Sequence, residues 1–377
     1  MNNVRTAKEP LFHIIKRAEL PWWKRYGIRA IAIIAAFIVA IILTQIFVGK
    51  DIGQFFNSMR KGSFATETTF WNMLYSVSLL LCVSVGLAPA FKMKFWNIGA
   101  DGQILMGCTA AYVCKRFFEK SIPSPVLVIV CLIAAVIAGA IWAVIPAIFK
   151  AKWNTNETLF TLMMNYIATQ FVLYLEKVWA KGTSLPSIAA GNLEQIYRNL
   201  STVLIVAAVT SFIFVYLKYS KHGYEIGVVG ESQNTAKYIG INIKKIIIRT
   251  LLLSGAICGL TGFLIICGKG INVALNSTVV GGIGFTAIIV AWLAKFNPGF
   301  MVLTSFFVVF VEKGASNVYS SNTAFGKFIV GIVFFFVIGC EFFITYQLKR
   351  TSGKKAVKSI AKADNSVTET DKTEIEK

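Results

Sequence analysis

Residues 218–249 read KYSKHGYEIGVVGESQNTAKYIGINIKKIIIR and form the longest polar interruption between two strongly apolar halves of the chain. The basic residues of this stretch are Lys218, Lys221, Lys237, Lys244, Lys245 and Arg249. Short loops rich in lysine and arginine are retained on the cytoplasmic side when a membrane protein inserts, so we expect the stretch there.

The centre of the stretch predicts a short helix. Ser232 and Asn234 can cap such a helix, Ala236 lies inside it, and Gly240 can end it. A helix of this size rarely stands alone in water, so it needs a partner to cover its apolar side. We therefore expect a docking surface, and an ordinary solvated loop between two spans is the alternative.

The apolar content of the chain predicts an integral membrane protein. Of its 377 residues 56% are hydrophobic and only 15% are charged, which is more apolar surface than one water-soluble core can bury. The formal net charge of +20 would suit a nucleic-acid partner, but the basic residues cluster beside apolar runs and form no separate basic face.

Cysteine and histidine point to no redox or metal chemistry. The seven cysteines fall in or near apolar runs, where a free cysteine behaves as a small hydrophobe, so no disulfide framework is predicted. The two histidines, His13 and His222, lie far apart and share no ligand spacing, so neither a metal site nor a catalytic residue is predicted.

Ten apolar segments are candidate membrane helices. They cover residues 28–48, 70–91, 95–118, 125–149, 158–175, 202–217, 246–267, 282–294, 299–311 and 325–346. The first is about 20 residues long, which suits a retained span better than a cleaved signal peptide. The segments 282–294 and 299–311 are short, which leaves open whether each is a full span or re-entrant.

Charge sorts the loops between the two sides of the membrane. Ten spans place both termini on one side, and most of the 38 lysines and arginines then fall on that side, which indicates the cytoplasm. We expect a basic cytoplasmic amino terminus over residues 1–27 and a transmembrane domain over 28–348. Residues 349–377 are polar, lack aromatic side chains and are expected to form a disordered cytoplasmic tail.

Polar residues within the predicted spans are candidate functional residues, because they are rare there. The segment FWNIGADGQILMG at 95–107 places Asn97, Asp101 and Gln103 at the cytoplasmic start of a span. Two of these side chains also have a structural interpretation, since Asn97 can cap the helix and Asp101 can face its positive amino-terminal end.

A second polar row lies in WNTNETLFTLMMNYIA at 153–168. Glu157, Thr161 and Asn165 are four residues apart and therefore share one face of a helix, which should point away from lipid. A path for a polar solute and a hydrogen bond between helices explain this face equally well.

Three motifs together resemble the permease subunits of ATP-binding-cassette importers for nucleosides and simple sugars. They are NIGADGQILMG at 97–107, NETLFTLMMNYIA at 156–168 and VVGESQNTAKYIGIN at 228–242, in the order of that family. The first two fit the nucleoside-type patterns NIG-x-[ED]-GQ and NE-x5-M-[LM]-NY. The third fits less closely, because the family commonly has Gly-x-Asn and paired alanines where this chain has Gly230-Glu231-Ser232 and Thr235-Ala236.

The resemblance implies an all-α polytopic fold of the ten-span type found in vitamin B12 importers, whose ATPase-contacting helices occupy the place of residues 218–249. This chain would form half of a nucleoside pathway in the cell membrane. Its partners would be a cytoplasmic ATPase, a second permease subunit of the same or a related chain, and an extracytoplasmic solute-binding lipoprotein. ATP and Mg would bind to the ATPase. No cofactor would bind to this chain, which has no G-x-x-x-x-G-K-[ST] loop.

On this interpretation the predicted substrate-pathway residues are Asn97, Asp101, Gln103, Glu157, Thr161 and Asn165. The predicted ATPase-coupling residues are Gly230, Glu231, Asn234, Ala236 and Gly240.

Three alternatives remain. The same machine could carry a simple sugar or another small polar solute. An ion-coupled secondary transporter is less favoured, because such carriers keep titratable groups near the middle of the membrane, whereas Asp101, Glu157 and Glu341 lie towards predicted cytoplasmic ends. A membrane enzyme is remote, since the sequence shows no set of acid, base and nucleophile.

Overall fold

The computed structural model describes residues 12–16, 21–180, 195–268, 275–319 and 324–350. The predicted tail beyond residue 350 and most of the predicted amino terminus lie outside these ranges. The chain divides into two compact units, one formed by Met1–Ile46 with Gly331–Lys377 and the other by Phe47–Val330.

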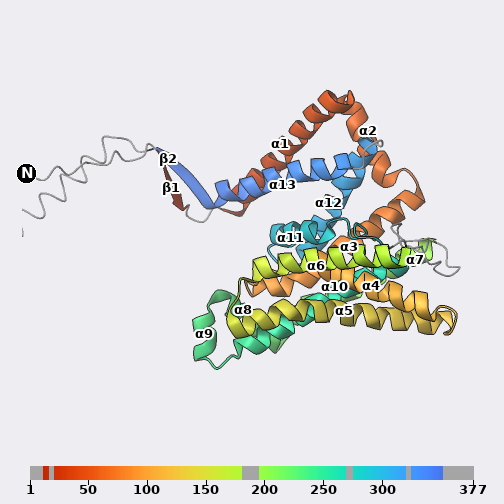
Figure 1. Cartoon of the computed structure of the whole chain (residues 1–377). Helices are drawn as coiled ribbons and strands as arrows, with labels where there is room; N and C mark the ends of the chain where they lie inside the picture. Colours follow the sequence, from red (N-terminus) through yellow and green to blue (C-terminus); the bar gives the residue numbers. More distant parts are fainter. Residues whose placement is uncertain (1–11, 17–20, 181–194, 269–274, 320–323, 351–377) are drawn as a thin grey trace, which may run out of the picture. The chain divides into compact units, whose positions relative to one another are not determined.

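The first unit pairs the two ends of the chain. It contains most of α1 (Trp22–Val48) and of α13 (Ala324–Thr345), which a hydrogen bond from Arg29 to Glu341 joins and which diverge from there in Figure 1. It also contains β1 (Phe12–Lys16) and β2 (Tyr346–Arg350), which form an antiparallel two-stranded sheet with Phe12 opposite Arg350. The sequence analysis did not predict these strands.

Every secondary-structure element in the described residues of the second unit is a helix. In chain order its elements are α2 (Ile52–Phe64), α3 (Glu67–Lys92), α4 (Ala100–Phe118), α5 (Ser124–Trp153), α6 (Glu157–Ala180), α7 (Gln195–Tyr219), α8 (Lys221–Glu231), α9 (Gln233–Tyr238), α10 (Ile243–Gly268), α11 (Ile283–Leu293) and α12 (Pro298–Val318).

The core of this unit is a close contact of α4, α5 and α10. Glycines make it possible, because a Cβ added at Gly107 of α4 would lie 2.7 Å from the Cα of Gly259 on α10. A Cβ at Gly139 of α5 would lie 2.6 Å from the same Cα atom. Small residues let helix backbones approach in this way in membrane bundles.

The described residues contain eight helices long and apolar enough to span a membrane. They are Gly27–Val48, Glu67–Lys92, Ser124–Trp153, Glu157–Trp179, Asn199–Tyr219, Ile243–Cys267, Pro298–Val318 and Ala324–Thr345. The all-α polytopic prediction is confirmed for the transmembrane part of the chain. The predicted segment 299–311 belongs to a helix of 21 residues, α12, which is long enough for a full span.

Two of the ten predicted segments, 282–294 and 95–118, differ from ordinary spans. Residues 282–294 form α11, which at 11 residues is too short to cross a bilayer alone. Residues 95–118 contain α4, which carries Asp101, Lys115 and Arg116 and packs against α5, α6 and α10. A helix surrounded by protein does not need an apolar outer surface, so α4 tolerates these charges.

The second unit has two distinct ends. Helix α2 ends three residues before α3 begins, and α3 then runs through 26 residues, or about 39 Å, to Lys92. There its carboxyl end meets α8, since a Cβ added at Gly230 would lie 3.1 Å from the carbonyl carbon of Lys92. Helices α8 and α9 therefore lie at the opposite end of this unit from α2.

Candidate functional site

The first predicted motif forms a break in the helical path between α3 and α4. Lys94 has a φ of +59°, which turns the chain out of α3 before α4 starts at Ala100. The Asn97 side chain closes the break from inside, because its Oδ1 accepts hydrogen bonds from Gly99 N at 3.1 Å and from Gln103 Nε2 at 3.1 Å. Asn97 and Gln103 are both buried.

Two side chains of α6 brace the same break. Thr161 Oγ1 accepts a hydrogen bond from Ile98 N at 3.2 Å. Asn165 Nδ2 donates to Ile98 O at 2.8 Å, and its Oδ1 accepts from Gly102 N at 2.8 Å. The first amides of a helix have no partner within the helix, so Asn165 satisfies one of these groups at the start of α4.

The two acidic residues of the predicted pathway lie at the edges of this cluster. Asp101 Oδ1 accepts from Gly284 N at 2.7 Å in the first turn of α11, where a carboxylate also interacts favourably with the helix dipole. Glu157 turns towards α5 and pairs with Lys150 at 2.8 Å.

The structure thus brings Asn97, Gln103, Thr161 and Asn165 together and places the two acids beside them. Thr161 is fully buried and Asn165 is only 8% exposed. Their polar atoms contact backbone groups, which are the helix-to-helix hydrogen bonds that the sequence left open as an alternative. The assignment of these six residues to a solute pathway stays a prediction.

The predicted docking stretch contains two helices where the sequence suggested one. Ser232 caps α9 by accepting from Thr235 N at 3.2 Å, as expected, and Gly240 follows the helix with a φ of +81°. The prediction that Asn234 could cap is wrong, because this residue lies within α9. Helix α8 was not predicted, and it begins where Ser220 Oγ accepts from Gly223 N at 3.0 Å.

Two of the predicted coupling residues are buried and three are exposed. Gly230 packs on α3 and Ala236 is buried, whereas Glu231, Asn234 and Gly240 face outwards. Tyr238, which the sequence analysis did not select, is 91% exposed. The sequence did carry a signal that could have selected Tyr238, namely an aromatic residue at the end of a short polar helix.

A polar contact ties α8 to α10. His222 Nδ1 lies 3.2 Å from Glu225 Oε2 and 3.0 Å from Arg249 Nη1. Together with the contact of Gly230 on α3, this fixes α8 to two membrane helices. A displacement of α8 and α9 would therefore be transmitted directly to the membrane-spanning helices α3 and α10.

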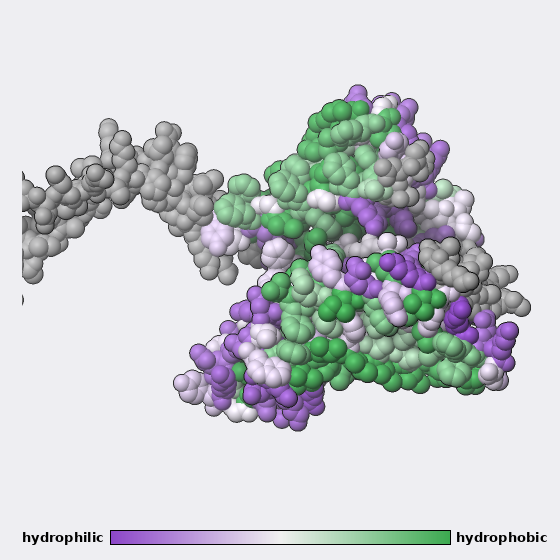
Figure 2. All heavy atoms as spheres, in the orientation of Figure 1, coloured by the Kyte–Doolittle hydropathy of each residue, from purple (hydrophilic) through white to green (hydrophobic). Residues whose placement is uncertain are grey.

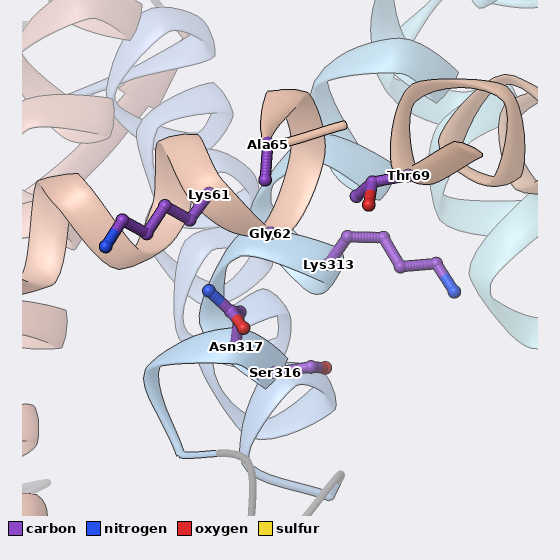
Figure 3. Close-up of a pocket in the computed structure, with 7 residues that line it drawn as sticks. All are labelled: Lys61, Gly62, Ala65, Thr69, Lys313, Ser316 and Asn317. Carbon is purple, nitrogen blue, oxygen red and sulfur yellow. The ribbon is translucent and has the colours of Figure 1, made fainter. Parts of the chain in front are cut away.

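A polar hollow of about 510 Å³ lies at the other end of the unit, between α2 and α12. It is lined by Lys61, Gly62, Ala65, Thr69, Lys313, Ser316 and Asn317. In Figure 3 the side chains of Lys61 and Lys313 point away from each other, so the hollow does not hold a pair of converging cations.

Comparison with known proteins agrees with the membrane architecture. The family described as branched-chain amino acid transport system / permease component matches residues 69–338. A guanosine ABC transporter permease protein of Bacillus subtilis is 29% identical over 289 residues, covering 73% of this chain and 81% of that protein.

Two further relatives match over more of the chain. A glucose ABC transporter permease protein of Haloferax volcanii is 26% identical, covering 88% of this chain and 92% of its own length. A nucleoside ABC transporter permease protein of Lactococcus lactis is 24% identical, covering 88% and 95%.

Proposed function

The chain belongs to the family of branched-chain amino acid transport system permease components, and from this we propose that it forms half of the membrane pathway of an ATP-driven nucleoside importer. It is a transport subunit, and ATP hydrolysis lies in a separate partner component. The observation that carries the proposal is the family match over residues 69–338 together with an exposed pair of short helices fixed to α3 and α10.

The proposed ATPase contact is the α8–α9 surface within residues 218–249. In α9 the buried Ala236 anchors the helix, while Tyr238 and Ile239 remain exposed. Exposed apolar groups on a short helix supply a surface for a protein partner. With α8–α9 in the cytoplasm, we place both termini there as well, and a solute-binding lipoprotein on the opposite side.

A second permease subunit, identical or related, completes the proposed pathway. The proposal includes Asn97, Asp101, Gln103, Glu157, Thr161 and Asn165 as residues bordering the path. The hydrogen bonds that Asn97, Gln103, Thr161 and Asn165 make at the break between α3 and α4 support a role in holding the wall in place.

The cargo proposed is a nucleoside, because two of the relatives described above are named for guanosine and for nucleosides. The relative named for glucose keeps a sugar as the second candidate.

Uptake by cells that express the complete importer tests the proposal. Labelled guanosine, uridine and glucose are offered separately, with a variant of the partner ATPase that cannot hydrolyse ATP as the control. We expect ATP-dependent uptake of a nucleoside. Uptake of glucose alone would show that the cargo is a sugar and not a nucleoside. Uptake unaffected by the inactive ATPase would contradict the ATP-driven mechanism.

A further inference from the structure

The free faces of α5 and α6 differ in chemistry. Helix α5 exposes an isoleucine at every fourth position, each more than half exposed: Ile129, Ile133, Ile137 and Ile141. At the same spacing α6 exposes Tyr166, Gln170 and Tyr174, and the two tyrosines are 60% and 61% exposed. Residues four apart lie along one line of a helix, so these three form a continuous line, the α6 strip, which the exposed Met163 and Ile167 border.

The position of Gln170 within α6 indicates what surrounds the α6 strip. It lies 13 residues after Glu157 in a helix of 24 residues, about 20 Å along it and near its middle. An amide facing hydrocarbon at this depth would have no hydrogen-bond partner, which is costly. Isoleucine is the kind of side chain that lipid accepts. We therefore expect the α5 line to face lipid and the α6 strip to face water or protein.

The surface of the molecule follows the same division. In Figure 2 green, hydrophobic residues cover the length of α5, whereas the surface over α6 mixes pale and purple residues with green ones. Thr161 and Asn165 are turned towards the break between α3 and α4, so the α6 strip lies on a different side of the helix. The described helices leave that side exposed.

Building on the proposed function, we propose that the α6 strip is the surface of the translocation pathway over which the nucleobase passes. Tyrosine rings offer aromatic faces, and stacking on an aromatic face suits every base. The amide of Gln170 can both donate to and accept from a base edge. Such contacts replace the water that a nucleobase loses on entering the membrane.

Thiol labelling tests whether the strip faces a water-filled path. Gln170→Cys and the matched control Ile137→Cys are treated with a membrane-impermeant, charged thiol reagent during ATP turnover, and labelling is compared with that of the unsubstituted protein. We expect Gln170→Cys to react several times faster than Ile137→Cys and to be protected by guanosine or uridine. Equal labelling of the two variants would overturn the inference.

A second outcome would also overturn the inference: nucleosides leave the labelling of Gln170→Cys unchanged, and the new cysteine crosslinks the permease subunits. That outcome would assign the strip to the subunit interface. The comparison of Gln170→Cys with Ile137→Cys measures water access and does not depend on which solute the importer carries, whereas protection by nucleosides does. Failure of the nucleoside proposal would instead show as the absence of nucleoside uptake by the unsubstituted importer.

Uptake tests the contact with the base. Tyr166→Leu and Gln170→Leu should lower nucleoside uptake per assembled complex by about tenfold, because a stacking or pairing contact is lost. Tyr166→Phe keeps the ring and should retain most of the rate, and Ile137→Leu should leave it unchanged. Unchanged uptake with both leucine variants on α6, at equal ATPase recovery, would contradict the inference.

Discussion

Asn165 makes hydrogen bonds with two backbone groups at the break between α3 and α4, and the loss of these bonds sets the expected effect of replacing it. Asn165→Leu leaves Gly102 N–H and Ile98 C=O without that partner in a buried place, at about 1–3 kcal/mol for each group. We expect a lower melting temperature in detergent and less folded complex. Nucleoside uptake normalised to folded complex should stay close to that of the unsubstituted protein.

Thr169→Val is the matched control on the same helix, because the Thr169 hydroxyl donates only to Asn165 O within α6 at 2.9 Å. It should leave the melting temperature nearly unchanged. A normal melting temperature for Asn165→Leu with a slow rate per complex would show that Asn165 acts on the solute after all.

The sequence could predict the shared face of these residues but not what the face contacts. A spacing of four placed Thr161 and Asn165 on one side of α6, as observed. Their partner is an irregular segment more than 60 residues earlier in the chain, and periodicity carries no information about such a contact. Glu157 shares the spacing, yet its carboxylate turns to Lys150 across the α5–α6 turn.

At the scale of elements, α9 allows a paired test with proline. Ala236→Pro removes the hydrogen bond from Ala236 N to Ser232 O at 3.0 Å and should break α9. We expect recovery of the ATPase with the purified permease, and ATP-dependent uptake, to fall at least several-fold. The membrane-spanning part should remain folded in a thermal unfolding measurement.

Gln233→Pro serves as the control, because residue 233 is the first position of α9 and Ser232 before it is already extended. Proline suits the first position of a helix, and extended backbone is what a proline favours in the residue before it. The α9 docking proposal fails if the two proline variants recover the ATPase equally well.

Helix α8 shows why part of this surface could not be predicted. Its sequence KHGYEIGVVGE contains three glycines, each of which disfavours a helix by about 1 kcal/mol relative to alanine. The helix forms because of tertiary contacts: Gly230 fits against the end of α3, and His222 contacts Arg249 of α10. Local propensity predicted the shorter α9, where capping residues are present, and missed the longer α8.

At the scale of the whole chain, the apolar runs predicted the helices well, and hydropathy alone could not show their surroundings. Helix α4 has charged residues at both ends and was predicted as an ordinary span, yet it packs among α5, α6 and α10. Helices α11 and α12 had similar short apolar cores. The structure extends α12 to Val318 through a polar carboxyl end and leaves α11 at 11 residues.

The tail predicts a simple outcome for truncation. Residues 353–377 are polar and carry no aromatic side chain, so they lack the apolar surface needed to fold alone. Deletion after Ser352 keeps both strands of the β1–β2 sheet. We expect membrane insertion and uptake close to the full-length level, measured at equal amounts of membrane protein; a large loss of uptake would show that the tail has a function.

The ends of the chain are joined by a charge pair, which can be tested by removing one partner or both. Arg29 Nε on α1 donates to Glu341 Oε1 on α13 at 2.9 Å, and both side chains are partly buried. Arg29→Leu leaves the carboxylate without this cation, which should cost up to about 3 kcal/mol and lower the melting temperature. The double variant Arg29→Leu with Glu341→Leu removes both charges, and apolar replacements of a buried pair are often neutral. It should therefore melt above the single variant and near the unsubstituted protein, and a double variant that melts as low as the single one would show that the loss does not come from the unpaired carboxylate of Glu341.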